Sequence, residues 1–232
     1  MVPAVVGKVR IKGGTVRALR VVPRRNLCVR TPSECPATFR LRSSYRLLVE
    51  MLDFLRQQVR RAWDWLETTV SDVTDEQANW WPPGTANSIG AGYLHTVINP
   101  DVEINRLLNG QVPIIERDWG GDVGQGTRYD PDRFDQWSRG VHVQWDRLHS
   151  YGLAVHTWLV GSLGELTEAD LARPVDMSRA GLGMWTGLDL YVLHGFSHIY
   201  QHGGEIACLK GLQGARGYLG GVDARPTRDR SS

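Results

Sequence analysis

The chain has 232 residues, of which 41% are hydrophobic, so it can bury a sizeable core in one domain that carries appendages. Three cysteines without a CxxC spacing argue against a disulfide framework, and no apolar run approaches the roughly 18 residues of a membrane span. The net charge of +2 conceals a basic first segment, which lacks the apolar stretch of a secretory signal. We therefore predict a cytoplasmic protein without a membrane partner.

Residues 1–43 form a basic leader, with ten Lys or Arg against one acidic residue. Basic clusters neutralise phosphates, so one interpretation is a nucleic-acid-binding arm, with a small hairpin around Gly13-Gly14. The segment carries no recognised nucleic-acid-binding motif. We favour a disordered tail, or sequence translated from a misassigned start, and do not expect nucleic acid as a partner.

Helical patterns begin after the leader. Residues 46–70 place apolar side chains at helical spacing without a Pro or Gly, which predicts a long first helix. Thr74-Asp-Glu-Gln77 then has the capping-box pattern of a short turn, which ends at Trp80-Trp81-Pro82. Asn87 or Ser88 is a suitable cap for a second helix.

This second helix should run through Leu108, but Pro100 removes a backbone donor and should kink it just beyond His95. Asp130 and Pro131 resemble the start of a third helix that extends to about Gly161.

Two further capping patterns follow in the last third of the chain. Thr167-Glu-Ala-Asp170 opens a short turn, and Thr186-Gly-Leu-Asp189 opens the final helix, which Gly211 closes. Four long helices predict an all-α protein, a four-helix bundle over residues 44–220 followed by a tail at 221–232. Metal sites in such bundles are built from side chains on facing helices.

His198 and His202 are the most informative residues, because two histidines four apart project from the same face of a helix. Imidazole is the commonest protein ligand for transition metals, so the pair can bind one ion. His194 extends the stripe, but it lies ~12 Å from His202 along the helix axis, too far for all three to share an ion. A third ligand must come from another helix.

The best third ligand is His95, which lies centrally in the second helix among small and apolar residues. His142, His149 and His156 recur every seven residues, a stripe that more often indicates packing or a solvated edge. Ile199 stands where a zincin would carry its catalytic Glu, so the His-Glu-x-x-His motif is excluded.

The segment around the histidine pair resembles the end of the DinB/YfiT-like family of metalloenzymes. The likeness covers approximately residues 44–220, and its motifs occur in the family's order. These are Leu66, Thr74-Asp-Glu-Gln77, Trp80-x-Pro82, Asn87-Ser-Ile-Gly90 ahead of His95, and His198-x3-His202-Gly-Gly-Glu-Ile-Ala-Cys-Leu-Lys-Gly-Leu-Gln-Gly.

The resemblance implies a four-helix bundle that holds a divalent metal ion, zinc or nickel or iron, through His95, His198 and His202. It assigns His194 to a supporting position that orients a ligand or the substrate. Trp80 and Trp81, near the loop before His95, are the tryptophans we consider for substrate contact. Members of the family often form homodimers, which no feature of this sequence decides.

Three neutral imidazoles leave coordination positions open, as in catalytic rather than structural zinc sites. A bound water would favour a hydrolase, whereas a bound thiol would favour a transferase or isomerase. The resemblance favours the thiol, since better-understood relatives use mycothiol or bacillithiol. Hydrolysis and a non-catalytic, stress-related metal-binding module stay open. Glu205 is a candidate to face the site, and Cys208 is expected to be a small buried residue.

Overall fold

The computed structural model describes the backbone of residues 37–128 and 134–218, and side chains at 51–128 and 136–218. The chain divides into two units, residues 1–43 and 44–232, and the described side chains all belong to the second. The hairpin predicted around Gly13-Gly14 and the helix start predicted at Asp130 and Pro131 lie outside the described residues. The boundaries at residues 43 and 220 stay a prediction.

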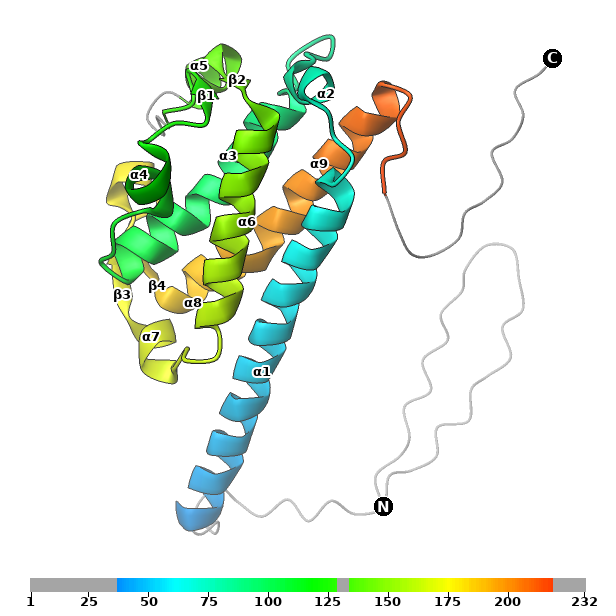
Figure 1. Cartoon of the computed structure of the whole chain (residues 1–232). Coiled ribbons are helices and arrows are strands. Elements are labelled where there is room, and N and C mark those ends of the chain that lie inside the picture. The colour runs from blue at the N-terminus through cyan, green and yellow to red at the C-terminus, as the bar shows by residue number, and fades with distance from the viewer. Residues whose placement is uncertain (1–36, 129–133, 219–232) are drawn as a thin grey trace, which may run out of the picture. The chain divides into compact units, whose positions relative to one another are not determined.

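The described part of the chain is mainly helical, which confirms the predicted all-α class (Figure 1). Within it, no helix combines the length and apolar character that crossing a bilayer requires. The α-helices are α1 (Ala37–Val70), α2 (Asp75–Asn79), α3 (Ile89–Asn99), α4 (Ile114–Trp119), α5 (Phe134–Gly140), α6 (Trp145–Ser162), α7 (Glu168–Ala172), α8 (Gly187–Leu190) and α9 (His198–Leu212). Two π-helices, η2 (Pro100–Leu108) and η5 (Tyr191–Ser197), and a 3-10 helix, η4 (Ser178–Ala180), complete the set.

Two small antiparallel sheets connect the helices, and neither was predicted. The first pairs β1 (Gly124–Gln125) with β2 (His142–Val143), and the second pairs β3 (Pro174–Asp176) with β4 (Met184–Thr186). In the second sheet Val175 lies opposite Trp185, whose ring stacks against the His194 ring of η5. Each sheet is only two or three residues long, so its role is to fix a connection.

The helix caps predicted at Thr74, Ser88, Thr167 and Thr186 are confirmed. Thr74 accepts a hydrogen bond from the backbone N–H of Gln77, whose side chain accepts one in return. Thr186 and Asp189 form the same capping box at the start of α8, and Ser88 caps α3. These caps satisfy N–H groups that have no partner within their helix, which is why a short local pattern locates them.

The prediction of one helix from Asp130 to Gly161 is wrong, because β2 and a new helix start interrupt that stretch. The Asn79 side chain exchanges two hydrogen bonds with the backbone of Val143, at 2.9 and 3.0 Å. The Asp75 carboxylate accepts the N–H of Trp145 at 2.9 Å and so caps α6. Both partners lie more than sixty residues away in sequence, beyond the reach of a local pattern.

Pro100 does not end the second helix, which continues to Leu108 as predicted. From Pro100 onward the backbone is π-helical, and the N–H of Asn109 donates to the carbonyl of Ile104 at 3.0 Å. A π-helix is rare and is frequently found at functional sites. In this helix it alters the rotation of every side chain that follows Pro100.

Helix α3 lies at the centre of the second unit and packs against both α6 and α9. Its buried side chains include Tyr93, Leu94 and Val97. Helix α1 lies beside α9 (Figure 1), and the fully buried Lys210 near the end of α9 donates to the carbonyl of Thr69 at 2.7 Å. The helices that carry the three predicted histidine ligands, α3 and α9, are therefore held in place by each other and by α6 and α1.

The Gly203-Gly204 pair that follows His202 shows how closely α9 approaches α1. A Cβ atom on Gly203 would lie 2.2 Å from the Trp65 ring, whereas one on Gly204 would meet nothing within 4 Å. A methyl group at position 203 must therefore push the indole or the helix aside. The two adjacent glycines differ because the Cα of Gly203 faces α1, whereas a Cβ on Gly204 would point into open space.

Gly203→Ala should lower the free energy of unfolding by about 1–3 kcal/mol, because the overlap with Trp65 outweighs the better helix propensity of Ala. Gly204→Ala is the matched control and should raise stability by up to about 1 kcal/mol. Urea unfolding of both variants measures the difference. Equal effects of the two substitutions would contradict the close packing of α9 on α1.

Candidate metal centre

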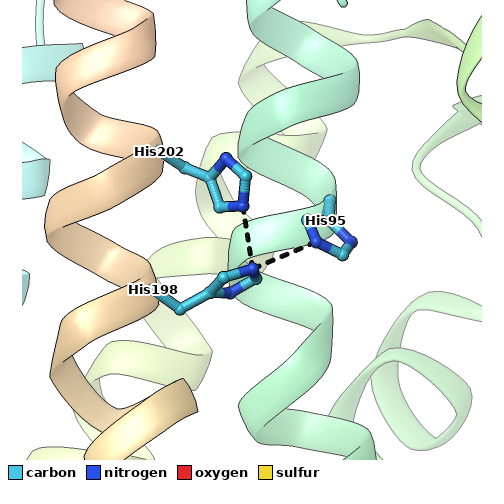
Figure 2. A group of neighbouring side chains, drawn as sticks. All are labelled: His95, His198 and His202. Carbon is cyan, nitrogen blue, oxygen red and sulfur yellow. Dashed lines mark hydrogen bonds between the residues drawn. The ribbon is translucent and has the colours of Figure 1, made fainter. Parts of the chain in front are cut away.

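Three histidines from two facing helices converge in the core (Figure 2). His95 lies on α3, His198 is the first residue of α9, and His202 follows one turn later. The Nε2 atom of His198 lies 3.1 Å from Nε2 of His95 and 2.8 Å from Nε2 of His202. One nitrogen from each ring lies within 4.8 Å of the others, and this is the single such His/Cys/Asp/Glu group found in the described residues.

Hydrogen bonds among the three rings cannot satisfy both nitrogen atoms of His198. A neutral imidazole has one donor and one acceptor nitrogen, and Nε2 of His198 has two ring nitrogens within hydrogen-bond distance. Its other nitrogen, Nδ1, is buried with no hydrogen-bond partner among the described residues. Nitrogens that bind one ion at ~2.1 Å lie roughly 3–3.4 Å apart, close to the two separations that involve Nε2 of His198. The donor set therefore fits a divalent cation.

Glu205 orients the third histidine. Its carboxylate Oε2 lies 2.6 Å from Nδ1 of His202, one turn further along α9. A carboxylate that accepts from Nδ1 leaves the lone pair on Nε2, which is the nitrogen directed at His198. The Glu205 side chain is 56% exposed, so it supports the site from the solvent side.

Burial keeps two of the rings uncharged. Desolvation is the main cause that lowers the pKa of His95 from 6.5 to about 3, and neighbouring His202 and His194 lower it further. Desolvation likewise lowers the pKa of His198 to about 2, with His202, His95 and His194 adding to it. Both rings are neutral near pH 7, which is the state that binds a metal ion.

The model of the DinB superfamily matches residues 58–206, more than half of the chain, and this range contains all three histidines. The chain belongs to the DinB superfamily. A comparison with curated proteins finds no match to it. Family membership agrees with the resemblance read from the sequence, and the convergence of the rings is an independent observation.

In this DinB-superfamily chain, His194 lies beside the triad without joining it. Its ring makes an edge contact with His198, with ring centroids 5.3 Å apart, and its Nε2 atom pairs with the Glu103 carboxylate on η2. The Trp185 ring stacks on its other side, with centroids 6.5 Å apart. The supporting position predicted for His194 stays a prediction, but its partners are now identified.

Asn99 and Glu103 were not singled out in the sequence. The side-chain amide of Asn99 lies 3.5 Å from Nε2 of His95, and Glu103 meets His194. With His95 they follow one another at intervals of four residues, which is a signal present in the sequence. Pro100 obscured it, because a kink was expected between them.

The remaining candidates have other described neighbours. The Trp81 ring lies under the Arg139 guanidinium at 5.1 Å, and Trp80 packs against the core, so their role in substrate contact stays a prediction. His149 pairs with Glu67 at 2.8 Å. The expectation that Cys208 is buried is wrong: it is exposed, because the outer face of α9 meets solvent there.

The lowered pKa values predict acid sensitivity of the metal-free protein. Below pH 6.5 His95 and His198 bind protons in the unfolded chain but stay unprotonated in the folded chain. The free energy of unfolding therefore falls as the pH drops toward about 3. Each ring contributes a slope of up to about 1.4 kcal/mol per pH unit. Urea unfolding at a series of pH values measures this slope after chelation of metal.

The double variant His95→Leu/His198→Leu should lose this part of the slope, because it has no imidazole to titrate at either position. The same slope in the variant and the original chain would show that other groups cause the acid sensitivity.

Proposed function

We propose that the protein binds a divalent metal ion through His95, His198 and His202 and joins a low-molecular-weight thiol, through its sulfur, to an electrophilic substrate. The observation that carries the proposal is the convergence of three imidazole nitrogens from α3 and α9. Three neutral ligands leave the full charge of the ion in place and leave positions open for a further ligand.

The donor set suits zinc or nickel, with iron as a further candidate, because imidazole binds all three. When bound, such an ion lowers the pKa of a coordinated thiol and so supplies a thiolate at neutral pH. The chain's own residues keep the site ready for it. Burial keeps His95 and His198 deprotonated, and Glu205 holds the tautomer of His202.

The proposed transfer is a simple substitution at the substrate. The thiolate sulfur attacks an electrophilic carbon, an S–C bond forms, and the leaving group departs with the electron pair of its bond. The thiol proton passes to solvent or to the leaving group, so that no oxidant or reductant is required. Mycothiol and bacillithiol are the thiols that the family resemblance suggests.

Metal content is the first test. The purified protein should hold about one zinc or nickel per chain by elemental analysis, and His198→Ala should lose it, because the central nitrogen of the triad is removed. His142→Ala is the control, since His142 is exposed and outside the triad. Unchanged metal content in His198→Ala would overturn the site.

Thiol chemistry is the second test. The metal-loaded protein is incubated with mycothiol, bacillithiol or a simple thiol and an electrophilic acceptor, and the thioether product is measured by mass spectrometry. We expect a thioether product that is lost in His198→Ala. Hydrolysis of an activated ester without thioether formation would favour a hydrolase, and neither product would favour a non-catalytic metal-binding module.

A further inference from the structure

A second polar cluster lies next to the triad, on the end of α3 and on the π-helical segments η2 and η5. Glu103 on η2 pairs with His194 on η5, and Asn99 at the end of α3 lies between His95 and Glu103 in the sequence. Its contacts with the triad are the Asn99 amide at 3.5 Å from Nε2 of His95 and the His194 ring against His198. The cluster therefore contacts the triad at two points: Asn99 contacts His95, and His194 contacts His198.

Of the four buried atoms of this cluster that make no hydrogen bond among the described residues, Nε2 of His194 and Oε2 of Glu103 contact each other, and the other two have no partner there. They are Oδ1 of Asn99, in a residue 3% exposed, and Nδ1 of His194, in a residue 5% exposed. Buried polar atoms in folded proteins are nearly always hydrogen-bonded, so such atoms indicate a ligand or a solvent molecule. In the tautomer whose proton lies on Nε2, toward Glu103, the His194 ring presents Nδ1 as an acceptor.

The cluster is rich in acceptors and carries a negative charge. Glu103 supplies a carboxylate, and the amide oxygen of Asn99 and Nδ1 of His194 supply two further acceptors. Within the described residues, the Glu103 carboxylate contacts Nε2 of His194, and no Lys or Arg side chain pairs with it. The Glu103 side chain keeps 15% of its surface exposed. A small group with several N–H donors and a positive charge matches this environment.

We propose that Asn99, Glu103 and His194 bind the ammonium group of the thiol whose sulfur lies at the triad. An ammonium group has three donors and one positive charge, which complements three acceptor groups, one of which is a carboxylate. The inference rests on the proposed function and narrows it to thiols that carry a free amine. Glu103 then selects the substrate by charge, and Asn99 selects it by hydrogen bonding.

The test compares two thiols of nearly equal shape, cysteamine and 1-propanethiol, which differ in an ammonium against a methyl group. Each is titrated into the cobalt(II)-loaded protein, and the thiolate-to-cobalt absorption band reports binding. The ammonium group of cysteamine also lowers the pKa of its thiol, which by itself favours binding to the ion. The ratio of cysteamine affinity to 1-propanethiol affinity is therefore compared between the original protein and each variant. Glu103→Gln should reduce that preference about tenfold, the effect of losing one charge-assisted contact.

Two variants complete the design. Asn99→Leu removes the amide with little change in volume and should reduce the same preference severalfold, so the inference stays testable if Glu103→Gln fails to fold. Glu165→Gln, at an exposed residue on a loop, should leave the preference as it is.

The outcomes separate the two proposals. An unchanged cysteamine preference in both Glu103→Gln and Asn99→Leu would overturn the ammonium subsite alone. A cobalt-loaded protein without a thiolate band for either thiol would overturn the thiol chemistry, and with it this inference. Failure to bind cobalt at all would overturn the metal site itself.

Discussion

Two imidazole rings that must stay uncharged, buried between α3 and α9, are the constraint on which the site depends. Desolvation lowers the pKa values of His95 and His198 so far that neither ring takes up a proton at physiological pH. The His198 ring can therefore neither become charged nor form a complete set of hydrogen bonds among the described residues. A cation that accepts all three lone pairs resolves both problems, and its binding would then stabilise the fold.

The packing around the rings fixes their positions relative to one another. Helix α9 can pack closely against α1 because Gly203 has no side chain. The buried Lys210 fixes the end of α9 by a hydrogen bond to the Thr69 carbonyl of α1. Helix α3 is surrounded by α6 and α9. The positions of the three Nε2 atoms therefore follow from contacts made well away from them, which is the preorganisation that binding and catalytic sites require.

Local sequence patterns were sufficient where the physical cause is local. The caps at Thr74, Ser88 and Thr186 depend on side chains within three residues, and the His198/His202 pair depends on helix geometry alone. Where the cause is distant, local patterns failed. The start of α6 depends on Asp75, and the partner of His194 is Glu103, ninety-one residues earlier in the chain.

His95 shows the boundary between these two cases. Its position among small and apolar residues made it the best third ligand for the histidine pair of the last helix, and the family resemblance implied the same three residues. The prediction of a long third helix was wrong because the interaction that interrupts this helix comes from a residue distant in the sequence. Propensity favoured a continuous helix, and the Asn79 side chain, by hydrogen-bonding the backbone of Val143, favours a strand there instead.

The π-helices η2 and η5 affect how relatives of this chain should be aligned. A π-helix takes more residues per turn than an α-helix, so a relative that is α-helical in these stretches reaches the same place in space with fewer residues. Alignments should therefore allow a gap after Pro100 and another before His198. Without those gaps, the residue matched to Glu103 or His194 would be its neighbour in sequence rather than its counterpart in space.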